Sequence, residues 1–199
     1  MKNAPSDTQR SAHDLIYARA PGTDGIWTFV FIDMIVFLLI FFVYMTDRLS
    51  NFAAYKAAQA TLNPLFGFAN TLLLLTSSWM VVEAIHAARN RKPRSVKWRL
   101  YGAIALGLLF CVNKVVEYHL EFAHGINFVS SPFYTFYFFI TIAHFLHVIA
   151  GLLFIRVFAQ SSNKCTISEQ YTVGLENVGL FWHYVDALWI FIFPLLYLV

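Results

Sequence analysis

Residues 25–45 read GIWTFVFIDMIVFLLIFFVYM, and this stretch decides the class of fold. It is 21 residues long, and Asp33 is its only Asp, Glu, Lys or Arg residue. Because about 20 apolar residues in an α-helix cross the hydrocarbon core of a bilayer, the stretch predicts a membrane-spanning helix. The preceding residues 1–24 are polar, unlike a cleaved signal peptide, so we expect this helix to be retained.

Four further apolar runs lie at 65–87, 98–118, 133–158 and 174–199. The chain is 59% hydrophobic and only 13% charged, a balance that excludes a water-facing globular surface. We therefore predict an all-α integral membrane bundle of five transmembrane helices over residues 25–199. A polar tail at 1–24 precedes it, and no separate soluble domain is expected.

The distribution of Lys and Arg predicts the orientation, because these residues stay on the cytoplasmic side during insertion. Of the fourteen, eleven lie in the N-terminal tail, the second loop and the region of the fourth loop. The first and third loops together hold only Arg48 and Lys56. The N-terminus is therefore predicted to be cytoplasmic and the C-terminus to lie on the opposite side.

The second loop, residues 89–99, reads RNRKPRSVKWR and contains six of these cations. Such a cluster attracts anionic lipid headgroups or a partner protein. It also serves as a topology determinant, and we favour that interpretation. The net charge of +3 thus reflects membrane topology, and nucleic acid is not an expected partner.

Several ionisable side chains lie inside the predicted spans, where each costs free energy unless it faces protein or water. They are Asp33, Glu83, His86, Lys114, Glu117, His144, His147, Glu176, His183 and Asp186. Because residues three, four or seven apart share a helix face, Lys114 and Glu117 are expected to pair.

The same spacing predicts two polar stripes. Glu176, His183 and Asp186 share one face of the fifth span, and His144, His147 and Gly151 share one face of the fourth. We expect the fourth and fifth helices to pack with these stripes facing each other, since Gly151 permits close approach. A buried hydrogen-bond network that holds the helices together is the favoured role of these groups.

Other roles remain open at this point. His144 or His147 opposite His183 would provide a bis-imidazole haem site, and a metal site in the bundle core is a further alternative. A small transporter could use the stripes as a path, although we find no inverted repeat. The two cysteines, Cys111 and Cys165, form no recognisable disulfide or metal motif.

The chain resembles subunit III of the haem-copper oxidases in its five-helix bacterial form. The most specific segment is LENVGLFWHYVDALWIF, residues 175–191, which is similar to the family's Glu followed by a Trp-His-aromatic-x-Asp stretch that ends in Trp. The matching residues are Glu176, Trp182, His183, Asp186 and Trp189. Such a string is improbable by chance.

Three further segments agree in order along the chain. They are ANTLLLLTSS at 69–78, KVVEYHLE at 114–121 and FFITIAHFLHVIAG at 138–151, which supply Asn70-Thr71, Glu117-Tyr118, and Thr141 with His144, His147 and Val148. Lys114 stands where the family usually has Gln, and Asp33 stands where it has a carbodiimide-reactive Glu. The stretch HGINFVSSPFYTFYF, residues 124–138, is similar to the subunit III-like proteins associated with nitric oxide reductases.

The resemblance implies a non-catalytic accessory subunit of a respiratory oxidoreductase in the bacterial inner membrane. No cofactor is expected in this chain. Haem with copper or non-haem iron is expected in a catalytic partner subunit, of a haem-copper oxidase or a nitric oxide reductase, and bound phospholipid at the interface. Such a subunit is thought to stabilise the core and to support proton uptake or gas access. Asp33 is either proton-linked or, as we favour, a neutral carboxyl group hydrogen-bonded to a neighbouring helix.

Overall fold

The structure is a computed structural model that describes residues 22–162 and 167–198, so most of the predicted tail and Cys165 lie outside it. The described residues form helices joined by short turns and loops, and no strand. Its elements are α2 (Asp24–Ser50), α3 (Phe52–Gln59), α4 (Pro64–Arg89), α5 (Pro93–Ala123), α6 (Pro132–Ser161), α7 (Glu169–Phe193) and a terminal π-helical turn, η1 (Pro194–Leu198). The predicted all-α class is confirmed.

Five of these helices are long and apolar enough to cross a membrane: α2, α4, α5, α6 and α7 continued by η1. The chain is therefore a multi-pass membrane protein, as predicted. Each helix is longer than its apolar run, and α7 begins five residues before the predicted limit, at Glu169. The reason is that backbone hydrogen bonding continues into the polar interface, where hydropathy gives no helix signal.

Local sequence signals fix where the helices begin. Pro64, Pro93 and Pro132 each occupy the first turn of a helix, where a missing N–H costs nothing. The side chains of Asn63 and Ser131 cap α4 and α6 by accepting backbone N–H groups. The short helix α3 was not predicted, because it lies within a loop outside the apolar runs.

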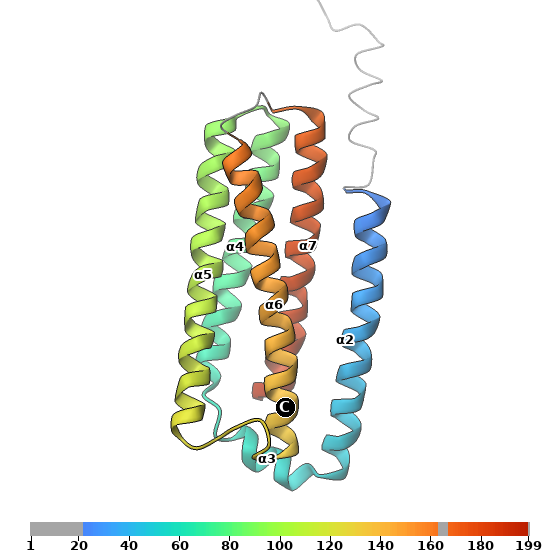
Figure 1. Cartoon of the computed structure of the whole chain (residues 1–199), viewed down its shortest axis with the longest axis vertical. Coiled ribbons are helices and arrows are strands. Elements are labelled where there is room, and N and C mark those ends of the chain that lie inside the picture. The colour runs from blue at the N-terminus through green and yellow to red at the C-terminus, as the bar shows by residue number, and fades with distance from the viewer. Residues whose placement is uncertain (1–21, 163–166, 199) are drawn as a thin grey trace, which may run out of the picture.

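The four helices α4 to α7 form a closed bundle, in which α4 and α6 each pack against both α5 and α7 (Figure 1). Two glycines allow α7 to approach closely. A Cβ atom at Gly151 would lie 2.6 Å from the ring of Trp182, and one at Gly107 would lie 3.1 Å from the same ring. The indole of Trp182 therefore fills the space that both glycines leave.

Helix α2 stands to one side of this bundle and contacts α7, α6 and α3 (Figure 1). Helix α3 runs below and packs against α6. The start of α2 and the end of η1 lie at opposite ends of the molecule, as an odd number of spans requires (Figure 1).

Candidate functional site

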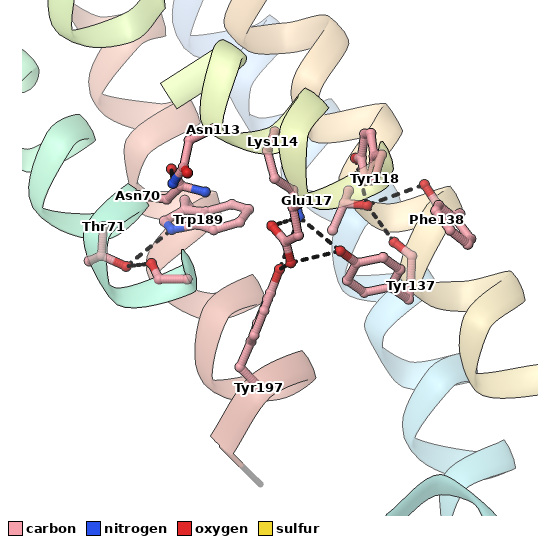
Figure 2. A network of polar contacts seen from close by, with 12 residues as sticks. Asn70, Thr71, Asn113, Lys114, Glu117, Tyr118, Tyr137, Phe138, Trp189 and Tyr197 are labelled. Carbon is pink, nitrogen blue, oxygen red and sulfur yellow. Dashed lines mark hydrogen bonds and ion pairs between the residues drawn. The ribbon is translucent and has the colours of Figure 1, made fainter. Parts of the chain in front are cut away.

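The most enclosed polar site surrounds Lys114 on α5, whose side chain has no exposed surface. Its ammonium Nζ donates to Oε2 of Glu117 at 3.0 Å, to the hydroxyl of Tyr197 at 2.9 Å and to that of Tyr137 at 3.2 Å (Figure 2). The predicted pairing of Lys114 with Glu117 is confirmed. The tyrosines bring α6 and η1 to the same point.

The second oxygen of Glu117 completes the cluster. Oε1 accepts a hydrogen bond from Tyr137 at 2.8 Å and another from Tyr197 (Figure 2). The carboxylate thus has a donor on each oxygen, and the ammonium has three acceptors. Full partnering offsets much of the cost of removing both charges from water.

Aromatic rings enclose the same cation. Nζ of Lys114 lies 4.9 to 5.6 Å from four ring centroids, which belong to Tyr137, Tyr118, Trp189 and Tyr197. Cation–π attraction strengthens when water is excluded, as it is here. Tyr118 also donates to Thr141 on α6 at 2.8 Å.

Two hydrogen bonds continue this network toward α4. The amide of Asn113 on α5 donates to Oδ1 of Asn70 at 2.7 Å, and the indole N–H of Trp189 on α7 donates to Thr71 at 3.1 Å (Figure 2). Every helix of the bundle therefore contributes a side chain to one polar network. The network ties the bundle together from within.

A second site joins α2 to the bundle at Asp33. Its Oδ2 accepts the hydroxyl of Tyr184 at 2.8 Å and lies 3.2 Å from Nε2 of His147. Nδ1 of His147 is 2.8 Å from the carbonyl oxygen of Ala143, which only accepts, so Nδ1 carries a proton. A hydrogen bond between Nε2 and Oδ2 would need a proton on one of these two atoms.

Two apolar grooves flank α2 beside this site. One, of about 530 Å³, lies between α2, α6 and α7 and reaches His147 and Asn177. The other, of about 240 Å³, lies between α2 and α7 and reaches His183 and Tyr184. The Asp33 site is therefore one of a few polar contacts across a boundary that also contains apolar grooves.

The two predicted stripes do not face each other. On α6, Gly151 meets Trp182, and the buried ring of His144 lies 5.2 Å from that of Trp189. On α7, His183 bonds to Ser78 of α4 instead. The expectation of facing stripes was wrong, because helical spacing defines a face without stating which neighbour it meets.

The polar residues near the α4–α5 turn form ion pairs. Arg89 donates two hydrogen bonds, of 2.8 and 3.0 Å, to Glu176 of α7. On α5, Arg99 lies 3.3 Å from Glu83 of α4, and His86 lies 3.6 Å from the same carboxylate. These pairs connect α4, α5 and α7 at that end of the bundle.

The far end of α2 is held by α3. Tyr55 of α3 is buried and donates to Asp47 of α2, and its ring lies 5.7 Å from that of Phe133 on α6. Burial, with the neighbouring Asp47 carboxylate, raises the pKa of the Tyr55 hydroxyl above its usual range. The hydroxyl therefore stays protonated and donates.

Within the described residues, no group of three or more His, Cys, Asp or Glu side chains is arranged to hold a metal ion. His147 and His183 contact different helices, so they do not form the facing pair of the haem alternative. The ring of His144 is enclosed by Phe110 and Trp189.

Sequence reasoning missed three tyrosines, Tyr137, Tyr184 and Tyr197, all of them inside apolar runs. A signal was present, since a phenol hydroxyl within the membrane needs a hydrogen-bond partner. Each of these tyrosines forms a hydrogen bond with an ionisable residue that the sequence analysis named, which is Lys114, Glu117 or Asp33. Tyrosines in the spans therefore indicate which helices approach those residues.

The fold and its polar sites define a multi-pass membrane bundle whose ionisable groups bond across helices. The family model described as cytochrome c oxidase subunit III matches residues 10–199. The cytochrome c oxidase subunit 3 of Synechocystis sp. is 32% identical over 179 residues, which cover 88% of this chain and 74% of that relative. The chain belongs to the cytochrome c oxidase subunit III family.

Two other relatives match along nearly their whole length. The cytochrome bo(3) ubiquinol oxidase subunit 3 of Buchnera aphidicola is 27% identical over 87% of this chain and 92% of its own. The cytochrome c oxidase subunit 3 of Corynebacterium diphtheriae is 28% identical over 90% of this chain and 89% of its own. These relatives are oxidase subunits and lend no support to the nitric oxide reductase branch.

Proposed function

We propose that this chain is the non-catalytic subunit III of a respiratory haem-copper oxidase in a bacterial inner membrane. The chain-long family match carries the proposal, since the relatives are named as subunits of cytochrome c and ubiquinol oxidases. The partner is then the catalytic subunit, which holds the haem and copper. The chain itself contributes structure and lipid contacts and no redox group.

The arrangement of polar and apolar groups in the chain agrees with a structural, non-catalytic role. Its charged groups pair with one another, within α5 at Lys114 and Glu117 and across helices at Arg89 and Glu176, rather than converging on an open cavity. The apolar flank of α2 is largely exposed and offers a surface for lipid or for the partner subunit. A rigid bundle with one loosely attached helix suits a subunit that packs beside a larger membrane protein.

The test is a mild-detergent pull-down of the tagged chain from its native membrane, followed by an optical spectrum and mass spectrometry. We expect a haem-copper oxidase core to copurify, and the haem absorption to vanish when that core is stripped away. Haem or stoichiometric metal retained by the isolated chain would overturn the proposal in favour of an independent haem or metal protein.

For Asp33 we propose a neutral tie between α2 and the bundle, supported by its bonds with Tyr184 and His147. The competing hypothesis is a proton-linked role. Asp33→Asn in the whole complex separates them. If the Asp33→Asn complex assembles normally but its turnover changes, the proton-linked role is favoured. If its turnover is unchanged, the proton-linked role is excluded.

The orientation is proposed from the cation distribution, with the α4–α5 turn in the cytoplasm. Reporter fusions after Leu62 and after Arg91 test it. We expect the first reporter to be active only in the periplasm and the second only in the cytoplasm, and the reverse result would invert the assignment.

A further inference from the structure

The turn between α4 and α5 contains basic side chains that form no ion pair with the described residues of the bundle. Two of the six cations there, Arg89 and Arg99, are occupied by the ion pairs with Glu176 and Glu83. The other four, which we term the basic turn, form no ion pair within the described residues. They are Arg91, Lys92, Arg94 and Lys97, of which the first three are exposed.

The backbone of the basic turn is strained at a charged residue. Arg91 has a φ of +51°, in the left-handed region that L side chains rarely adopt. Its N–H bonds to the carbonyl of Ala88 at 2.9 Å, and that of Lys92 bonds to the carbonyl of Ala87 at 3.0 Å. This is a Schellman motif, in which glycine is the usual residue at the position of Arg91.

Topology alone does not require a base at that position. Any Lys or Arg in the loop helps to retain the loop on the cytoplasmic side during insertion. The loop contains five such residues besides Arg91. Glycine would complete the turn without strain. Neither the turn geometry nor the membrane topology therefore accounts for a base at Arg91.

The basic turn lies where an outward-facing apolar helix surface begins. Next to it on α5, the side chain of Trp98 is 69% exposed, and Nζ of Lys97 lies 6.0 Å from the ring centroid of Tyr101. Exposed apolar residues such as Leu108 and Val112 continue along α5. Tryptophan and tyrosine favour the level of lipid headgroups, so the four bases lie at that level.

We propose that the basic turn binds the phosphate-bearing headgroups of anionic phospholipids. The four uncompensated cations supply the attraction, and Trp98 and Tyr101 anchor the same helix end in the interface. A lipid headgroup layer fits better than an acidic protein segment, because the bases continue directly into the apolar flank of α5.

The test uses the full chain purified in a neutral detergent. Phosphatidylglycerol or phosphatidylcholine is titrated in, and bound lipid is counted by native mass spectrometry. We expect a preference for phosphatidylglycerol that weakens as salt rises, and about fivefold weaker binding for each base removed. The variants are Arg91→Gly and the double variant Arg94→Gln/Lys97→Gln.

Arg91→Gly separates binding from folding, because it relieves the strained backbone while removing one base. We expect unchanged or higher thermal stability without lipid, together with weaker binding of phosphatidylglycerol. Arg91→Lys should retain the binding. Lys56→Gln, at the opposite end of the molecule on α3, is the matched control and should bind as the unmodified chain does.

Three outcomes would overturn the proposal. The first is equal binding of the two lipids by the unmodified chain, and the second is full preference for phosphatidylglycerol in the variants. The third is a variant that binds phosphatidylglycerol normally but no longer copurifies with a partner polypeptide, which would assign the basic turn to a protein contact. The lipid titration needs no partner subunit, so its result is independent of the proposed accessory function.

Discussion

Helices α2 and α7 are both long enough to cross a membrane, yet they are held in different ways. In the most apolar window of α2 only 6% of the residues are buried, whereas half of those in the α7 window are. Helix α7 is fixed by packing, as where Trp182 fills the space at Gly151. Helix α2 is held by two buried rings, Phe37 and Tyr44, and by a few polar contacts, of which Asp33 makes two.

The difference suggests that the molecule has a rigid part and an adjustable part. Changes inside the bundle should lower the global stability, because they leave buried groups without partners. Changes at the contacts of α2 should alter only how that helix is attached. The predictions below test this division from the largest expected effect to the smallest.

Removing one member of the buried pair should have the largest effect. Glu117→Gln leaves the ammonium of Lys114 buried without its counter-charge, and we expect a loss of about 3–5 kcal/mol of unfolding free energy. Unfolding in mixed detergent micelles measures it. The double variant Lys114→Met/Glu117→Gln should recover much of the loss.

Val116→Ala, on the same turn of α5 but facing outward, is the control and should change stability little. If the double variant is as unstable as Glu117→Gln alone, side-chain packing and not charge pairing stabilises this site.

Closing the space beside Trp182 should come next. In Gly151→Ala the new Cβ would lie 2.6 Å from the indole, and such overpacking costs about 1–3 kcal/mol. Gly25→Ala on α2 meets nothing within 4 Å and is the matched control. We expect it to be neutral or slightly stabilising in the same unfolding experiment, since alanine favours helix. Equal losses in both variants would contradict the division into two parts.

Breaking a contact of α2 should act locally. Tyr184→Phe removes the hydrogen bond to Asp33, and hydrogen bonds between membrane helices average about 0.6 kcal/mol. Hydrogen-exchange mass spectrometry should show faster exchange in α2 with α4 to α7 unchanged. Tyr101→Phe, at an exposed tyrosine, should leave both parts unaffected. Faster exchange across the whole molecule would show that α2 belongs to the rigid part.

The smallest effect is expected at the partly exposed ion pair. The side chain of Arg89 is 38% exposed, so Arg89→Gln should cost near the lower end of about 0.2–1 kcal/mol, and the cost should shrink in high salt. Thermal unfolding at two salt concentrations measures it. Arg156→Gln, at an exposed cation with no ion pair among the described residues, is the control. A loss that is large and independent of salt would show that this exposed pair stabilises the bundle as strongly as the buried Lys114 site does.

Much of the fold was predictable because its signals are local. Pro64, Pro93 and Pro132 lie just before or between the apolar runs and are first-turn residues of α4, α5 and α6. The pairing of Lys114 with Glu117 was predictable for the same reason, since they are three residues apart on one helix. Tyr197, a further partner of Lys114, lies 83 residues away and no periodic pattern connects them.

The sequence by itself determined the number of spans, their approximate limits and the family, because hydropathy and motifs add up along the chain. Only the tertiary structure decided which faces meet, as in the bond of His183 to Ser78 and the position of α2 at the side of the bundle. The physical reason is that lipid and protein core are about equally apolar, so a membrane helix is apolar all round. Which side of such a helix contacts which neighbour therefore depends on close packing and on the partners of its few polar groups.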